Sequence, residues 1–360
     1  MSLKPDLSVE VAGVKLDNPL VLSEGPQSGS SRLIERAAQY KMGAIVTKSV
    51  RLEPSKSENP YMISAGRGLI NADWTDIGFD AWLDELDKLK LDKPLFVNVG
   101  VNYCKPPKAA ELAAELQRHG ASFVTFSDYE PENLVEVVRY TKKSVNVPVM
   151  VKLPPFVKHV GDLCKRLEDA GVNMIAAMDA VGPAMDIDIG LRSAVLGSAG
   201  AFGYLSSAPI FPLTLAYIAE IAANVNVPVL GVGGVSTPED VIKLIMAGAT
   251  CVGVVGSAIL KGLRIFDALV DGLEIWMAKN GVKDLDEIRG AAQPSMHREP
   301  RRDLRARVDT AACTGCGLCE RTCYAGAIAM EYQKAVVGSY CSGCGVCESV
   351  CPSEAIRVRL

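Results

Sequence analysis

The stretch Cys313-x-x-Cys316-x-x-Cys319-x-x-x-Cys323 is followed, after a short spacer, by Cys341-x-x-Cys344-x-x-Cys347-x-x-x-Cys351-Pro352. Iron in a cubane cluster takes thiolate ligands, and gaps of two residues let three cysteines of one tight loop reach three irons of the same cluster. Two such runs predict two [4Fe-4S] clusters and a small folded module at this end of the chain.

The two runs have the spacing of a bacterial-type ferredoxin module, a small α+β domain that holds two clusters. In such modules the fourth cysteine of each run ligates the cluster of the other run. We therefore expect one cluster on Cys313, Cys316, Cys319 and Cys351, and the second on Cys341, Cys344, Cys347 and Cys323. Tyr324 stands where the first run would normally carry a proline, which changes the turn but not the ligands.

Zinc and disulfides are the alternatives for these cysteines. Zinc sites usually use two well-separated pairs of ligands, whereas each run places four cysteines within eleven residues. Disulfides would imply an exported protein, but the first residues, Met-Ser-Leu-Lys-Pro-Asp-Leu, contain no apolar signal-peptide core. Clusters need a reducing compartment, so we expect a cytoplasmic protein.

Composition limits the remaining possibilities. The 360 residues, of which 49% are hydrophobic and 22% charged, suit one large globular domain and one small one. No run of eighteen apolar residues is present, which argues against a membrane span. The formal net charge of −4 argues against a nucleic-acid-binding surface.

Upstream of the cysteines, short apolar runs alternate with amphipathic stretches. Alternation of strand and helix, eight times over, predicts an α/β fold, a (β/α)8 TIM barrel. An open doubly wound sheet is the weaker alternative, because it has difficulty placing eight parallel strands within about 250 residues. The expected strands are Leu20–Ser23, Ala44–Lys48, Leu95–Val99, Phe123–Phe126, Val149–Lys152, Met174–Met178, Val229–Gly231 and Val252–Val255.

Glycines and long intervals refine this plan. Four glycines precede expected strands, where the end of a helix requires a left-handed residue: Gly43, Gly120, Gly171 and Gly248. Two longer intervals, 49–79 and 179–211, are expected to be binding loops at the C-terminal face of the barrel. We expect a barrel over residues 1–292, a polar linker over 293–307 and the ferredoxin-like domain over 308–360.

Glycine-rich segments and two lysines mark the same end of the expected barrel. Residues 231–236 and 253–258, at the ends of strands seven and eight, offer bare backbone amides for a phosphate. Lys48 and Lys152 end apolar strands, where an ammonium group is costly unless it meets an anion or a carbonyl. A reduced flavin carries negative charge near N1–C2=O, which a lysine would stabilise. The alternative is a lysine that reaches solvent at the rim.

These residues resemble the dihydroorotate dehydrogenase family. The whole layout resembles the pyrimidine-reducing part of dihydropyrimidine dehydrogenase, in which an FMN-binding barrel is joined to a C-terminal 2[4Fe-4S] ferredoxin module. The likeness covers nearly the entire chain, in order. The segments that carry it are Asn18-Pro19-Leu20-Val21-Leu22-Ser23-Glu24-Gly25, Val46-Thr47-Lys48-Ser49, Asn98-Val99-Gly100, Val151-Lys152-Leu153-Pro154, Gly233-Gly234 and Val255-Gly256-Ser257-Ala258.

The resemblance implies that the barrel binds FMN and acts on a small cyclic or acidic molecule. Asn71 matches a family asparagine that holds the substrate, and Arg67 on the same long loop is a candidate to bind a substrate carboxylate. The resemblance places the flavin ring near Ser23, Glu24, Lys48, Asn98 and Lys152. It places the flavin phosphate on Gly233, Gly234, Gly256 and Ser257, with Ser207 at the same site.

The chain departs from the family where the proton-transfer group is expected. The family has an Asn-x-Ser-Cys-Pro loop after strand four, whereas this chain has Thr125-Phe126-Ser127-Asp128-Tyr129-Glu130-Pro131. Asp179 replaces a substrate-binding asparagine, and Ser206-Ser207 stands where the family has Ser-Gly. Cys104 is either an inert loop thiol or a reactive one whose pKa the neighbouring Lys105 would lower. The candidates for catalysis are Lys48, Ser127, Asp128, Tyr129 and Cys104.

We therefore expect an oxidoreductase that interconverts a C=C bond conjugated to a carbonyl with its dihydro form and passes electrons through both clusters. No Gly-x-Gly-x-x-Gly motif lies between a strand and a helix, so a separate NAD(P)H/FAD subunit or a soluble ferredoxin is the expected electron partner. A homodimer or a hetero-oligomer is expected. The alternative is a non-catalytic FMN/Fe-S electron-transfer subunit of a larger redox complex.

Overall fold

The computed structural model describes residues 4–66, 68–72, 76–101, 104–296 and 304–358. The chain divides into two compact units, Met1–Met296 and His297–Leu360. None of the described helices is both long and apolar enough to cross a membrane.

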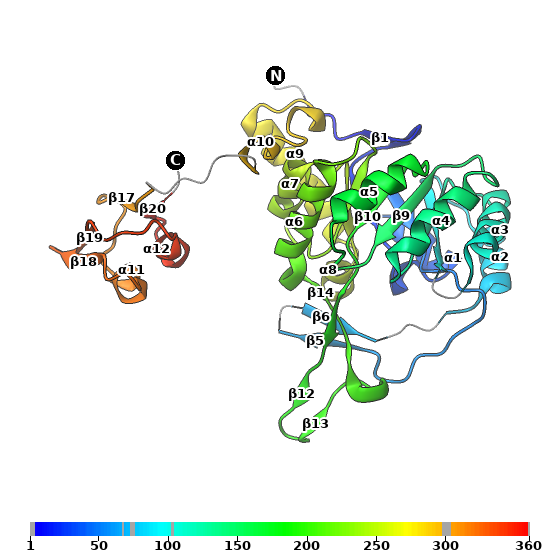
Figure 1. Cartoon of the computed structure of the whole chain (residues 1–360), viewed down its shortest axis with the longest axis horizontal. Helices are drawn as coiled ribbons and strands as arrows, with labels where there is room; N and C mark the ends of the chain where they lie inside the picture. The colour runs from blue at the N-terminus through cyan, green and yellow to red at the C-terminus, as the bar shows by residue number, and fades with distance from the viewer. Residues whose placement is uncertain (1–3, 67, 73–75, 102–103, 297–303, 359–360) are drawn as a thin grey trace. The chain divides into compact units, whose positions relative to one another are not determined.

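Eight of the described strands close a parallel barrel in the first unit, which confirms the predicted (β/α)8 fold (Figure 1). Strands in such a barrel are covered on both faces, and every residue of these eight is buried except Ser127 at the end of its strand. The strands, in their order around the barrel, are β10 (Met174–Ala177), β15 (Val229–Val232), β16 (Cys251–Val254), β3 (Leu20–Leu22), β4 (Ala44–Val46), β7 (Leu95–Gly100), β8 (Phe123–Ser127) and β9 (Val149–Leu153).

Helices follow the barrel strands and surround them (Figure 1). Helix α3, for example, buries Leu112 and Leu116 and contacts β7 and β8. The helices are α1 (Ser31–Ala37), α2 (Phe79–Lys88), α3 (Pro106–Arg118), α4 (Pro131–Thr141), α5 (Val160–Asp169), α6 (Phe211–Ala222), α7 (Pro238–Ala247), α8 (Gly256–Lys261), α9 (Ile265–Asn280) and α10 (Gln293–Met296). An antiparallel hairpin, β1 (Val9–Val11) with β2 (Val14–Leu16), precedes the barrel.

The ends of α7 show how local sequence sets a helix. The Oγ1 of Thr237 accepts a hydrogen bond from the N–H of Asp240, and the Asp240 carboxylate accepts one from the N–H of Thr237. This reciprocal capping box satisfies two amide donors that have no partner within the helix. Gly248 ends the helix in the left-handed conformation, with φ of 117°.

The predicted role of helix-ending glycines holds at three of four positions. Gly120, Gly171 and Gly248 have φ of 92°, 96° and 117°. The prediction for Gly43 is wrong, because its φ is not positive. A Cβ at Gly43 would instead overlap the carbonyl oxygen of Asn18, so glycine is required there by close packing.

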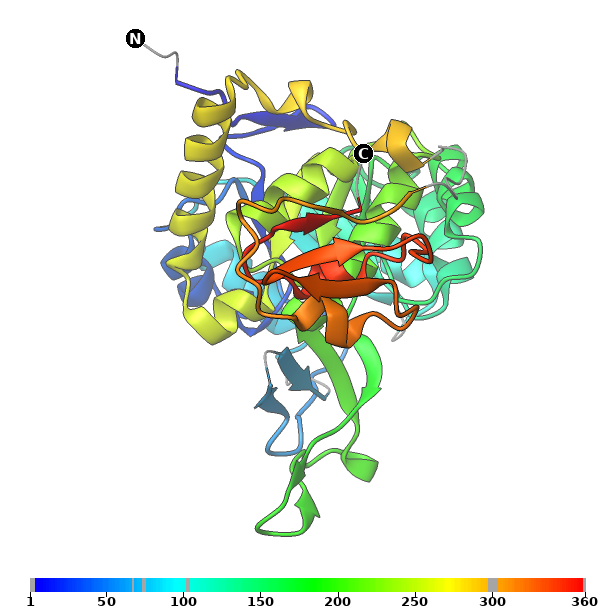
Figure 2. The same ribbon diagram turned by 90° about the vertical axis from the view of Figure 1, so that its left-hand side faces the viewer.

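The two long intervals, which the sequence predicts as loops, together form a sheet. Residues 49–79 contribute β5 (Met62–Ala65) and β6 (Gly68–Asn71), and residues 179–211 contribute β11 (Val181–Ala184) and β14 (Gly203–Ser207). These strands form a four-stranded antiparallel sheet in the order β11-β14-β6-β5. A further hairpin, β12 (Ile187–Asp188) with β13 (Ser193–Ala194), projects away from the barrel (Figures 1 and 2).

The described part of the second unit, orange and red in Figure 2, consists of two antiparallel strand pairs and two short helices. Its buried residues include Cys319, Cys347, Ile328 and Ile356. A domain with so small an apolar core usually needs cross-links or metal sites to be stable. The elements are β17 (Arg307–Val308) paired with β20 (Ile356–Arg357), β18 (Ile328–Glu331) paired with β19 (Lys334–Val337), α11 (Leu318–Thr322) and α12 (Val346–Val350).

Candidate functional site

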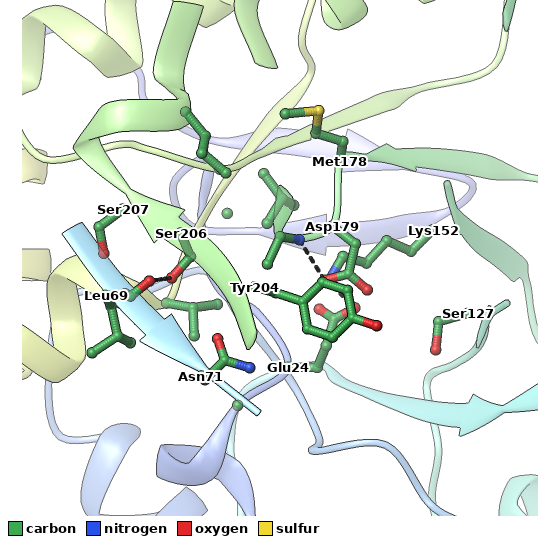
Figure 3. A pocket seen from close by; sticks show the side chains of 18 of the residues that line it. Glu24, Leu69, Asn71, Ser127, Lys152, Met178, Asp179, Tyr204, Ser206 and Ser207 are labelled. Carbon is green, nitrogen blue, oxygen red and sulfur yellow. Dashed lines mark hydrogen bonds and ion pairs between the residues drawn. The ribbon is translucent and has the colours of Figure 1, made fainter. Parts of the chain in front are cut away.

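A large pocket opens at the C-terminal ends of the barrel strands and is bordered by the inserted sheet (Figure 3). It encloses about 1270 Å³, counted out to its open mouth. The predicted site residues that line it are Glu24, Lys48, Asn71, Ser127, Asp128, Tyr129, Lys152, Asp179, Ser207, Gly233, Gly234, Gly256 and Ser257. Of the others, Ser23, Asn98 and Cys104 do not line it, and Arg67 lies outside the described residues.

Lys152 is the centre of a buried charge cluster. Its Nζ lies 2.9 Å from Glu24 Oε1 and 3.2 Å from Asp179 Oδ1 (Figure 3). Burial disfavours the ammonium form, but the negative charges of Asp179 and Glu24 outweigh that effect and raise the pKa of Lys152. The direction of this pKa shift favours the ammonium form of Lys152. The alternative of a lysine that reaches solvent is excluded, because Lys152 is only 7% exposed.

Lys48, which lies in the segment after β4, is also buried beside a carboxylate. Its Nζ lies 3.9 Å from Asp76 Oδ2, and the side chain of Lys48 is buried. The other oxygen of Asp76 accepts hydrogen bonds from Trp82 Nε1 at 2.9 Å and from the N–H of Gly78 at 3.3 Å. The inserted segment after β4 thus fixes a second cation at the pocket wall.

Asn98 lies one layer behind the lining. Its Nδ2 donates to Ser49 Oγ at 2.8 Å and to Ser127 Oγ at 3.4 Å, and its Oδ1 accepts from Thr125 Oγ1 at 2.9 Å. Since Ser49 and Ser127 both line the pocket, Asn98 orients two lining hydroxyls. The sequence predicts Asn98 as a residue near the flavin ring, but not that it lies behind the residues that line the pocket.

Backbone amides face the pocket at the ends of β15 and β16. Among the described residues, the N–H groups of Gly233 and Gly234 have no protein acceptor. Those of Gly256 and Ser257 belong to the first turn of α8, where the helix supplies no acceptor. Amides that point into a cavity in this way suit a phosphate group.

Close packing gives its own reason for glycine at Gly233 and Gly234. In the structure a Cβ at Gly234 would lie 2.5 Å from the backbone of Phe211, and one at Gly233 would lie 2.5 Å from Thr214 Oγ1. The packing of the start of α6 against this turn therefore requires both glycines.

Two buried hydroxyls near the amides have no protein partner. The Oγ atoms of Ser207 and Ser23 are buried, and neither makes a hydrogen bond among the described residues. A buried polar group without a partner is costly, so such atoms mark a place where a polar ligand completes the structure. Ser207 lines the pocket next to Gly256, so the residues present fit a phosphate-bearing cofactor such as FMN.

The loop after β8 holds three of the predicted acid candidates, which differ in burial and in hydrogen bonding. Asp128 is buried; its Oδ1 accepts from the N–H of Glu130 at 2.9 Å and its Oδ2 from Asn133 Nδ2 at 3.3 Å. Both carboxylate oxygens thus stabilise the start of α4. Ser127 and the exposed Tyr129 also line the pocket.

The prediction of a lowered pKa for Cys104 is wrong. The thiol is half-buried, and burial raises its pKa, with a further contribution from the negative charge of Asp128. A thiol with a raised pKa is mostly protonated and is a poor nucleophile. Its position outside the pocket lining agrees with the alternative of an inert thiol.

Two further cavities lie in the second unit, each bordered by four of the predicted ligands. Their volumes are about 330 and 310 Å³. Within the described residues, no three His, Cys, Asp or Glu side chains converge on a single-ion site; the thiols surround a cavity instead. One cavity is bordered by Cys313, Cys316, Cys319 and Cys351, and the other by Cys323, Cys341, Cys344 and Cys347.

Comparison with known proteins agrees with this geometry. The family model described as dihydroorotate dehydrogenase matches residues 127–277, and the one described as a 4Fe-4S dicluster domain matches residues 312–355. The catalytic subunit of dihydroorotate dehydrogenase B (NAD(+)) from Pyrococcus abyssi is 31% identical over 300 residues, which cover 79% of this chain and 99% of that protein. This chain belongs to the dihydroorotate dehydrogenase family. It is an oxidoreductase of the class that acts on CH–CH groups.

Other members of the dihydroorotate dehydrogenase family show the same extent of similarity. The proteins of the same name from Pyrococcus furiosus and Geotalea uraniireducens are 30% and 31% identical, over 80% of this chain and 99% and 98% of their own lengths. About a fifth of this chain lies outside each match, so it is longer than these relatives.

Several pocket residues were not predicted as site residues. Tyr204 and Leu69 come from the inserted sheet, which the sequence did not reveal, and Met178 follows β10. Two further arginines on the long loops, Arg51 and Arg192, are, like Arg67, candidates from the sequence to bind a substrate carboxylate. Arg51 lines the pocket and donates to Ser55 Oγ at 3.1 Å, whereas Arg192 is exposed and does not line it. The pairing of β14 with β6 joins residues more than a hundred positions apart, and no local pattern signals it.

Proposed function

We propose that this chain is an FMN- and iron–sulfur-dependent oxidoreductase. Its reaction would interconvert a C=C bond conjugated to a carbonyl with the dihydro form of a small cyclic or acidic substrate. The observation that carries the proposal is one pocket in which two amide-lined strand ends and two buried lysines meet. FMN, when bound there, supplies hydride transfer to or from a substrate carbon and exchange of single electrons with iron–sulfur clusters.

The chain's own residues have distinct roles in this proposal. The amides of Gly233, Gly234, Gly256 and Ser257, with the hydroxyl of Ser207, would bind the phosphate. Lys152, kept cationic by its carboxylate neighbours, would stabilise negative charge at the flavin ring edge.

The substrate would lie near three polar lining residues. Asn71 offers an amide donor and acceptor, and its Nδ2 donates to the carbonyl of Ala72 at 3.2 Å. Asp179 presents only acceptors when ionised, so it favours N–H groups on the substrate over carbonyl oxygens. Lys48 supplies positive charge on the pocket wall. A ring that carries both amide and carbonyl groups suits this set.

We further propose that two [4Fe-4S] clusters occupy the cysteine cavities of the second unit. Each cluster would take three cysteines from one run and the fourth from the other run. The electron partner would be a separate NAD(P)H/FAD subunit or a soluble ferredoxin, in a homodimer or hetero-oligomer. The relatives named above are called catalytic subunits, which supports a partner protein. Because the ligand thiols need a reducing compartment, we place the protein in the cytoplasm.

Anaerobic purification followed by a substrate screen tests this function. The protein is expected to contain FMN and iron, and a dihydro substrate is expected to bleach the flavin absorbance. Dihydroorotate is the first compound to test, because the relatives carry its name, followed by dihydrouracil and other cyclic dihydroamides. Colourless protein would contradict the proposal.

A non-catalytic electron-transfer subunit is the second candidate, because the family's acid loop is altered. Such a subunit would pass electrons between dyes and clusters but show no bleaching with any compound of the screen. The Cys351→Ala variant sharpens the distinction. In an enzyme it keeps bleaching by substrate while electron delivery to an external acceptor falls, with Cys104→Ser as the cysteine control for iron content.

A further inference from the structure

Tyr204 lies on β14 of the inserted sheet and lines the pocket (Figure 3). In the ladder between β14 and β6 it is directly opposite Asn71. Residues directly opposite each other project from the same face of a sheet, with Cβ atoms about 5 Å apart. A molecule that contacts Asn71 is therefore within reach of Tyr204.

The ring of Tyr204 is fixed by two neighbours. It stacks with the ring of Tyr129, with centroids 5.8 Å apart and an interplanar angle of 19°. A Cβ at Gly182, on the adjacent strand β11, would lie 2.6 Å from Tyr204 Cδ1. Glycine at position 182 thus leaves room for the ring, and Tyr129 limits its movement. Such fixation is what a group needs when it must meet a reacting atom.

The other acid candidates are less suited to proton transfer. Both carboxylate oxygens of Asp128 are used by the start of α4, and Cys104 does not line the pocket. Ser127 is an alcohol, a far weaker acid than a phenol. The hydroxyl of Tyr204 donates to no protein acceptor among the described residues, so it is available to a ligand.

We propose that Tyr204 exchanges a proton with the substrate carbon in the proposed reaction, on which this inference rests. In reduction, the C=C π bond breaks and two C–H bonds form. FMN, when bound, would supply the hydride with its electron pair to one carbon, and the phenolic proton of Tyr204 would pass to the neighbouring carbon. The phenolate then takes a proton from water, which has access because Tyr129 beside it is 47% exposed. Oxidation runs through the same steps in reverse.

The Tyr204→Phe variant removes the proton but keeps the stacked ring. The chemical step, measured as anaerobic flavin bleaching by substrate, is expected to slow by about 100-fold or more. The dissociation constant of the unsaturated product from the oxidised protein is measured from the shift that the product causes in flavin absorbance. It is expected to change by less than about threefold, since the ring remains. Tyr140→Phe, on the exposed face of α4, is the matched control and should match the wild type.

The Gly182→Ala variant tests the same role without altering Tyr204. The added methyl displaces the ring, so bleaching should slow, and the double variant with Tyr204→Phe should be no slower than Tyr204→Phe alone. Gly190→Ala is the control in the same inserted segment, because its Cβ meets only the end of the Asp188 side chain at 3.3 Å.

The outcomes separate this inference from the proposed function. If the wild type bleaches with substrate and Tyr204→Phe bleaches equally fast, the proton role is wrong and the function stands. If the variant loses product binding while its chemical step is unchanged, Tyr204 is only a binding residue, and the inference is again wrong. If the wild type shows no substrate-dependent bleaching, the proposed function fails and this inference fails with it.

Discussion

Lys152 Nζ lies 2.9 Å from Glu24 Oε1, in a pocket wall where Lys152 is almost fully buried. The raised pKa of this lysine has a consequence for stability. A raised pKa means that the folded protein binds the proton more tightly than the unfolded chain. The stabilisation is therefore complete below the unfolded pKa of lysine, about 10.4, and is lost as pH rises through the folded value.

The Glu24→Gln/Asp179→Asn double variant should reduce this alkaline effect. The free energy of unfolding of the wild type, measured by urea denaturation from pH 8 to pH 11.5, should fall more steeply above about pH 10.4 than that of the variant. Other lysines and tyrosines titrate in this range in both proteins, so the difference between the two curves is the quantity to compare. Parallel curves would show that the carboxylates do not hold the proton on Lys152.

Ser207 and Gly256 form a second close pair, in which Ser207 is expected to lower the stability of the apoprotein. Ser207 has φ of 69° and ψ of −160°, a region that only glycine adopts without strain, and its Oγ occupies the space that a Cβ on Gly256 would need. The Ser207→Gly variant should raise the free energy of unfolding of the apoprotein by about 1 kcal/mol, because strain of 1–3 kcal/mol is partly offset by the greater freedom of unfolded glycine.

The same variant should bind FMN more weakly, by about tenfold, because one hydroxyl donor to the phosphate is lost. Ser207→Ala separates the two effects. It loses the hydroxyl but keeps the Cβ and the strained backbone, so FMN binding should fall, and the difference in stability between Ser207→Gly and Ser207→Ala reports the backbone strain. Fluorescence of released FMN measures the first quantity and denaturant unfolding the second.

Gly234→Ala tests whether the packing of α6 sets the phosphate turn. The methyl group would lie 2.5 Å from the backbone of Phe211, so the turn must move and FMN binding should be lost, with a fall in stability of more than about 2 kcal/mol. Gly281→Ala is the matched control, since Gly281 also has positive φ but has no atom within 4 Å of the added position. It should cost about 1 kcal/mol and leave FMN content unchanged.

Most of the barrel could be predicted because its signals are local. Each barrel strand is a short run of buried aliphatic residues, such as Val149–Leu153, and the glycines that end α3, α5 and α7 have the predicted positive φ. Cysteine spacing likewise predicts both cavities of the second unit, because ligands in one run are neighbours in sequence. The fourth ligand of each cavity follows from the known exchange between runs.

The inserted sheet could not be predicted, because its stability depends on pairing between distant segments. The strand that carries Tyr204 is a five-residue segment with two serines, and its burial comes from β6 and β11 beside it. For the same reason the pKa of Cys104 was misjudged. The neighbour in sequence, Lys105, matters less than burial and the negative charge of Asp128, which the fold brings close.

The proposed exchange of ligands between the two cysteine runs makes a selective prediction. Cys351→Ala removes one ligand from the cavity of Cys313, Cys316 and Cys319 and none from the other cavity. The variant should lose about half of its iron, and Cys323→Ala should lose the other half. Iron analysis and low-temperature electron paramagnetic resonance of the reduced proteins distinguish the two remaining clusters. Identical spectra from the two variants would contradict the assignment of ligands.

Asp128 provides the final test, because it lies in the loop where the family's proton-transfer group is expected and yet uses both carboxylate oxygens within the protein. Asp128→Ala removes the acceptors for the N–H of Glu130 and for Asn133 Nδ2 and should cost about 1–2 kcal/mol of stability. Asp128→Asn keeps one acceptor oxygen and should recover part of that loss.

If Asp128 were the acid, both variants would slow substrate-dependent bleaching by about 100-fold or more, whatever their stability. We expect bleaching rates instead to follow the stability of the loop, with Asp128→Asn closer to the wild type, because a carboxylate engaged in this way positions the start of α4 and the neighbouring Tyr129 rather than a proton.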